Sequence, residues 1–79
     1  MPVDAETRDR FAIRCIVVST QSGMATIALL HADDPAGRDR LQTAILARGN
    51  RLLNDIDRSH ALSPASELLM RAARAAVAG

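Results

Sequence analysis

Two apolar runs separated by a short polar segment occupy the first part of the chain. Residues 11–19 are rich in β-branched side chains and carry a single charge, a pattern that predicts a β-strand. Residues 24–30 predict a second strand, and Gly23 closes the polar segment between them, where a tight turn is favoured. Together the two strands would form a β-hairpin, which is only marginally stable in water unless another element covers it.

The middle of the chain shows the periodicity of an amphipathic helix over residues 35–58. Its apolar positions recur at helical spacing, at Leu41, Ile45, Leu52 and Ile56, flanked by Leu46 and Leu53. Asp34 is a suitable N-cap, and Pro35 fits the first helical position. Gly49 interrupts the pattern, because a glycine inside a helix costs about 1 kcal/mol relative to alanine. The sequence therefore leaves open whether this segment is one helix or two pieces that meet at Gly49.

A last helix is predicted to begin after Ser63, which would be its N-cap, with Pro64 at the first helical position. Its apolar stripe consists of Leu68, Leu69, Ala72, Ala76 and Val77. The expected fold class is therefore α+β, an N-terminal β-hairpin followed by two α-helices in the order ββαα. We expect a flexible N-terminus over residues 1–9 and one small domain over residues 10–79.

Large apolar side chains are scarce in this sequence. The 79 residues are 48% hydrophobic, but fifteen of them are alanine and Phe11 is the one aromatic residue. A chain of this size buries only about 60% of the surface that it exposes when unfolded. We therefore expect a homodimer to complete the core, although the sequence does not separate self-association from pairing with a different chain. Multi-domain enzymes and disulfide scaffolds are excluded by length and by the single cysteine.

The net charge of +1 argues against a strongly electropositive surface for nucleic acid. All ten basic residues are arginine, which pairs well with carboxylates and is a favoured anchor in protein interfaces. The predicted long helix carries a candidate partner-binding set, Arg38, Arg48, Arg51 and Arg58. The plainer interpretation of the same residues is a solvated helix face balanced by neighbouring aspartates.

Candidate chemistry is sparse along the chain. Cys15 falls inside the first predicted strand, where we expect a buried small hydrophobe rather than a reactive thiol. His31 precedes Asp33 and Asp34, but this cluster is better explained as a helix start than as a metal site. We therefore expect no catalytic residue, cofactor or metal. The lone cysteine and the short apolar runs predict a cytoplasmic protein without a membrane partner.

Two stretches are similar to known families. Residues 62–74 resemble the second helix of ribbon-helix-helix repressors and antitoxins, in which small polar residues precede a Glu-Leu-Ile-Arg-x-Ala pattern. That resemblance implies a dimeric DNA-binding protein with residues 41–47 as the groove-reading strand and residues 50–61 as the first helix. Pro2 after Met1 is similar to the start of small tautomerases, which implies an N-terminal proline amine as the catalytic group.

The sequence yields no combination of nucleophile, base and orienting group. Our first hypothesis is therefore a small non-enzymatic protein-interaction module, a regulator, adaptor or stoichiometric inhibitor that acts by binding another protein. The ribbon-helix-helix repressor or antitoxin is the alternative hypothesis, and the tautomerase-like enzyme that uses Pro2 is a remote one.

Overall fold

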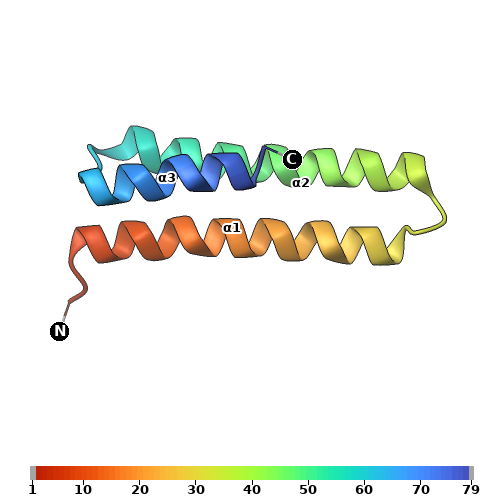
Figure 1. Ribbon diagram of the computed structural model, residues 1–79, viewed down its shortest axis with the longest axis horizontal. Helices are drawn as coiled ribbons and strands as arrows, with labels where there is room; N and C mark the ends of the chain where they lie inside the picture. The colour runs from red at the N-terminus through yellow and green to blue at the C-terminus, as the bar shows by residue number, and fades with distance from the viewer. Residues whose placement is uncertain (1, 79) are drawn as a thin grey trace.

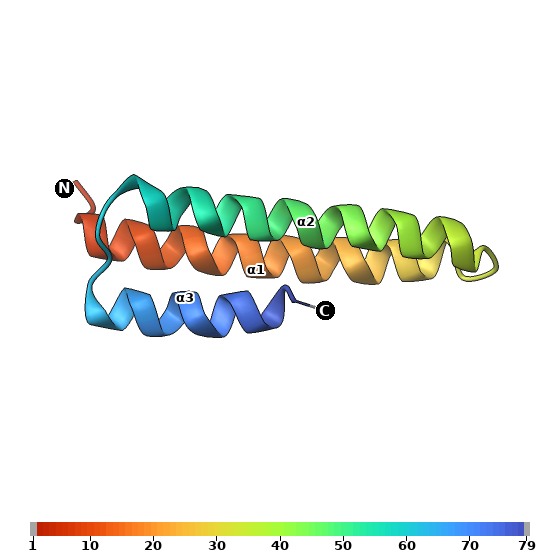
Figure 2. The same cartoon turned by 90° about the horizontal axis from the view of Figure 1, so that it is seen from above.

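The computed structural model describes residues 2–78, which form three α-helices and no strand. The helices are α1 (Ala5–Leu30), α2 (Pro35–Ser59) and α3 (Pro64–Ala76). The first two form a long antiparallel hairpin, and α3 turns back along the half that holds the chain's N-terminus (Figure 1). Seen from above, α3 lies to one side of the stacked α1 and α2 (Figure 2), and it packs mainly against α1.

The expected α+β fold is wrong, and its ββαα order fails at both strands. Residues 11–19, the polar segment 20–23 and residues 24–30 all lie within α1. The helical period is hidden because apolar side chains occupy opposite faces: Ile13 is buried in the bundle, whereas Phe11 and Val18 are exposed. A run that is apolar all round has no helical stripe, so the β-branched composition alone was misleading.

The N-terminal turn of α1 is fixed by a side-chain cap. Asp4 accepts a hydrogen bond from the backbone N–H of Thr7 at 2.7 Å, and this bond holds the pKa of the Asp4 carboxyl below its ordinary value. Residues 5–9, which we expected to precede the ordered domain, therefore belong to α1. Asp9 in particular is buried.

The predicted start of α2 is confirmed, and the question of a break is settled. Asp34 caps the helix by accepting from the N–H of Gly37 at 3.2 Å, with Pro35 in the first turn. The helix continues without interruption through Gly49, which is buried against α1. A β-carbon on Gly49 would lie 2.7 Å from Oγ1 of Thr20. The glycine thus permits the close approach of α1 and α2 at this point.

The predicted start of α3 is also confirmed, since Ser63 accepts from the N–H of Ser66 at 3.1 Å and Pro64 follows the cap. All three helices contribute to the core, which consists of Ile13, Leu53, Met70, Ala73 and Val77. These residues lie in the half of the molecule that α3 covers. The other half is a two-helix hairpin.

Ser66 is a fully buried residue whose hydroxyl finds no hydrogen-bond partner among residues 2–78. An unsatisfied buried hydroxyl carries a desolvation cost of about 1–3 kcal/mol. We therefore expect Ser66→Ala to raise the free energy of unfolding by about 1 kcal/mol, measured by urea denaturation. Ser63→Ala is the matched control, and it should instead destabilise α3 because it removes the cap. A loss of stability in Ser66→Ala would contradict the expectation.

Candidate functional site

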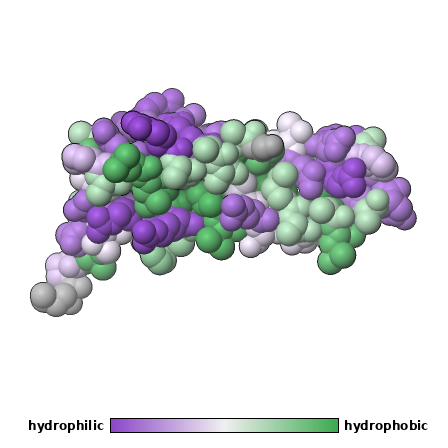
Figure 3. All heavy atoms as spheres, in the orientation of Figure 1, coloured by the Kyte–Doolittle hydropathy of each residue, from purple (hydrophilic) through white to green (hydrophobic). Residues whose placement is uncertain are grey.

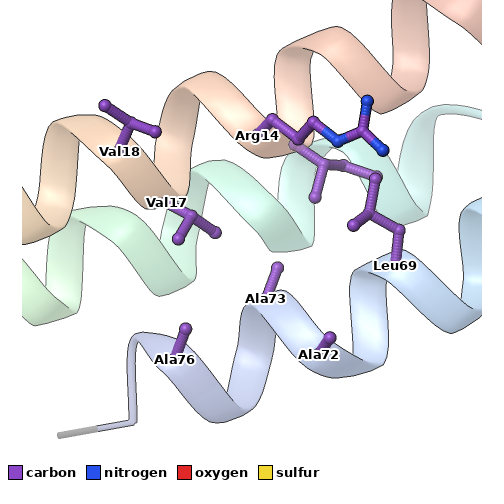
Figure 4. A pocket seen from close by; sticks show the side chains of 8 residues that line it. Arg14, Val17, Val18, Leu69, Ala72, Ala73 and Ala76 are labelled. Atoms are coloured by element: carbon purple, nitrogen blue, oxygen red, sulfur yellow. The ribbon is translucent and has the colours of Figure 1, made fainter.

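An open groove of about 340 Å³ lies between α1 and α3, beside the core. From α1 it is lined by Ile13, Arg14, Val17 and Val18, and from α3 by Leu69, Ala72, Ala73 and Ala76. Figure 4 shows that the labelled side chains of α3 point up toward α1, with Val17 above Ala76. Apart from Arg14, every lining side chain is apolar.

The small residues on the α3 side of the groove account for its depth. Ile13 and Ala73 form its floor and are buried, whereas Ala72 and Ala76 are exposed on its α3 side. Because alanine ends at the β-carbon, this side of α3 leaves room that a larger residue would fill. The space-filling view shows hydrophobic surface between hydrophilic areas over the half where α3 lies along α1 (Figure 3).

Arg14 is the one charged residue at the groove. Its side chain is exposed, and it forms no ion pair within the described part of the chain. A guanidinium group binds a carboxylate through two parallel N–H donors, which adds direction as well as attraction. The groove therefore combines apolar walls with one cation that is able to orient an acidic ligand group.

A polar network holds α1 to the link between α2 and α3, next to the groove. His60 Nε2 lies 2.8 Å from Oδ2 of the buried Asp9, and His60 Nδ1 lies 2.6 Å from Oγ of Ser59. Ser59 Oγ also donates to the backbone carbonyl of Ile56 at 2.8 Å. The serine is thus engaged with its own helix, and we interpret the network as a structural tie between distant segments.

The tie is extended at the start of α3. The hydroxyl of Ser63 donates to Glu6 Oε1 at 2.7 Å, and Arg10 pairs with the same carboxylate oxygen at 3.1 Å. These contacts fix the N-terminal end of α1 relative to the first turn of α3. They consequently fix the spacing of the two helices that form the groove.

The predicted arginine set does not form a single cluster. Arg48 and Arg51 are exposed on α2, and Arg58 pairs with Asp55 at 2.9 Å on the same outer face. Arg38 is half-buried, lies 4.0 Å from Asp39, and precedes Arg48 by about 15 Å along the helix. The partner-binding role of these residues stays a prediction, and none of them lines the groove.

Several other residues singled out in the sequence have defined positions. Cys15 is exposed on α1, so the expectation of a buried strand residue is wrong. Asp34 serves as the α2 cap, and its carboxylate lies 3.6 Å from His31. Pro2 is exposed in the extended segment before α1, and the described residues contain no group of three or more that could hold a metal ion.

The strand needed for a ribbon-helix-helix arrangement is helical. Residues 41–47 lie inside α2, and residues 50–59 continue the same helix, so the segment that would enter the major groove does not exist in this fold. The resemblance of residues 62–74 is therefore limited to an amphipathic helix with a serine cap.

The length and composition of α1 alone would allow it to cross a membrane. The apolar runs that were too short to span a bilayer separately combine into one 26-residue helix, and the cytoplasmic location stays a prediction. Helices of soluble bundles and signal sequences can share these properties.

In comparisons with known proteins, no family model matches the chain, and no curated protein and no solved structure matches it either.

Proposed function

We propose that this protein is a small non-enzymatic interaction module that binds another protein through the groove between α1 and α3. The observation that carries the proposal is the groove itself, which is apolar, lies beside the core and has Arg14, unpaired among the described residues, at its edge. Burial of apolar surface would supply affinity, and the arginine would set the orientation of the ligand.

The shape of the groove favours an amphipathic helix as the bound segment. Two neighbouring helices with alanines on one wall offer the surface against which a further helix packs in a bundle. Binding of a helix in a groove is a common mode of peptide recognition, in which apolar anchors recur every three or four residues. A carboxylate on the flank of that helix would face Arg14.

A module of this kind would act as a regulator, an adaptor or a stoichiometric inhibitor. We place it in the cytoplasm, where the exposed thiol of Cys15 would remain reduced. In that setting α1 is a bundle helix rather than a membrane span. The arginines of the outer face of α2 would then be a second contact surface for an acidic partner.

The proposal is tested by blocking the groove and capturing partners from the native host. Ala76→Arg places a long charged side chain in the groove, whereas the control Ala75→Arg adds the same charge on the exposed side of α3, outside it. We expect one or more proteins to be retained by the unmodified chain and by Ala75→Arg, and to be lost with Ala76→Arg. Circular dichroism of all three proteins checks that the helices are intact.

A retained protein would then be purified and titrated into isotopically labelled protein. The backbone NMR chemical shifts of Val17, Leu69 and Ala72 should change more than those of residues outside the groove. Arg14→Gln should weaken binding by about tenfold. Partners that bind equally well to Ala76→Arg, or shifts confined to α2, would overturn the proposal.

A further inference from the structure

The side of α1 that faces away from the bundle carries a second apolar surface. We call this surface the outer stripe, and it consists of Phe11, Cys15, Val18, Ser22, Ala25 and Leu29. Ser22 is its one hydroxyl-bearing member, and Val18 also lies at the edge of the groove between α1 and α3. All of these residues are exposed, and Phe11, Val18 and Leu29 expose 69%, 61% and 78% of their surface. The opposite face of the same helix holds the buried Ile13 and Thr20. Thus α1 has one apolar face inside the bundle and another in contact with solvent.

The spacing of the outer stripe is that of a helix-pairing seam. Its members are separated alternately by four and three residues, the repeat with which one helix packs along another. The stripe extends about 27 Å along the helix axis. The order of the spacings is the same in both directions along the chain, so a reversed copy presents members of the stripe at matching heights.

We propose that the outer stripe pairs with the outer stripe of a second copy of this chain. The two α1 helices are antiparallel, and the two-fold axis crosses the stripe at the height of residue 20 along the helix. In this register Phe11 of one copy lies opposite Leu29 of the other, Cys15 opposite Ala25, and Val18 opposite Ser22. The large residues at the two ends of the stripe, Phe11 and Leu29, thus meet each other. Each of these contacts occurs twice, as in any two-fold interface.

The charges beside the stripe favour the antiparallel direction. Arg8 and Asp33 form no ion pairs within the described chain, and they lie near opposite ends of α1. Antiparallel pairing brings Arg8 of each copy beside the turn that holds Asp33 of the other. A parallel pair would instead bring Arg8 near Arg8 and Arg14 near Arg14, which is repulsive.

The surface area of the monomer is consistent with an additional interface. The chain exposes 5359 Å², whereas a compact monomer of 8.5 kDa exposes about 4,700 Å². The excess is comparable with the area that each partner buries in a standard protein interface, about 800 Å². The elongated hairpin thus exposes extra surface comparable in area to one side of a dimer contact.

A lipid bilayer is the rival occupant for the outer stripe. The centre of α1 carries Ser19, Thr20, Gln21 and Ser22 in succession, and Arg14 lies closer to its N-terminal end. In a membrane these polar groups would occupy the hydrocarbon region, where each costs free energy. At a protein interface Ser19 and Gln21, which flank the outer stripe, can remain hydrated at the rim, and only the small Ser22 enters the seam. The observations therefore favour a second copy.

Disulfide cross-linking distinguishes the two directions of pairing, because Cys15 is the only cysteine. In the antiparallel register the two Cys15 residues are separated by about 15 Å along the axis, too far for a disulfide. Ala25→Cys places a new thiol opposite Cys15 of the second copy. We expect Ala25→Cys to become a covalent dimer on mild oxidation, and the unmodified protein to remain uncross-linked. Cys15→Ser in the Ala25→Cys background should abolish the cross-link.

Sedimentation equilibrium measures the dimer without a cross-link. We expect a dimer in the unmodified protein and an increase in its dissociation constant of about tenfold to hundredfold in Phe11→Ser, with the helical content unchanged. Ala76→Arg, which blocks the groove, should leave the dimer intact, so this inference and the proposed function can fail separately. The proposal is overturned by a monomer at every concentration, by a Cys15–Cys15 cross-link in the unmodified dimer, or by a protein that binds phosphatidylcholine–phosphatidylglycerol vesicles instead of dimerising.

Discussion

Leu53→Ala is expected to lower the free energy of unfolding by about 2–5 kcal/mol, one of the largest effects of any single truncation in this chain. Leu53 is fully buried at the point where α2 meets both other helices. Its truncation removes apolar contacts and leaves a cavity between three packed helices, which can relax only in part to fill it. Urea unfolding followed by circular dichroism at 222 nm measures the change.

The neighbouring Leu52 provides a matched control for this experiment. It has the same side chain on the same helix but is only half-buried, so we expect Leu52→Ala to cost less than half as much. The sequence pattern placed Leu52 in the apolar stripe and Leu53 at its flank. Equal effects of the two truncations would contradict the orientation of α2 in the structure, which buries Leu53 more deeply than Leu52.

Gly49→Val is expected to destabilise the protein by about 1–3 kcal/mol, because it overfills the space where Gly49 of α2 lies close to α1. A β-carbon at this position would meet Thr20 Oγ1 at 2.7 Å and Val77 Cγ1 at 3.5 Å. The helices would have to separate near the core, which outweighs the better helix propensity of valine. The melting temperature and the urea midpoint should both fall.

Two further variants connect this effect to the packing rather than to the loss of a glycine. Gly23→Ala, where the added carbon meets only the flexible Ile45 side chain at 3.3 Å, should change stability much less. Thr20→Ala should recover part of the loss when combined with Gly49→Val, because it removes the clashing hydroxyl. Additive effects of the two substitutions would contradict this explanation.

Local signals in the sequence predicted the second and third helices well. Asp34 and Ser63 each precede a proline, and both act as the caps that this pattern predicts. A cap depends on atoms within three residues, so its signal is complete in the sequence. The continuity of α2 through Gly49 was not predictable, because it depends on the approach of α1, a distant segment.

The first helix was missed for a different physical reason. Its β-branched residues favour strands only weakly, and the periodicity that would have opposed this preference is hidden because both faces are apolar. The groove was missed as a consequence, because Val17 was placed in a strand while Leu69 was placed in a helix. The tie between Asp9 and His60 joins residues 51 positions apart, for which no local pattern exists.

The unequal lengths of the helices give the molecule two ends of different character. Because α3 ends halfway along the hairpin, the turn at residues 31–34 is supported by one helix pair, whereas the opposite end is braced by three helices and the Asp9–His60 tie. Local unfolding should therefore begin at this turn and progress toward the core. The ends of α1 and α2 next to the turn can fray while the groove keeps its shape.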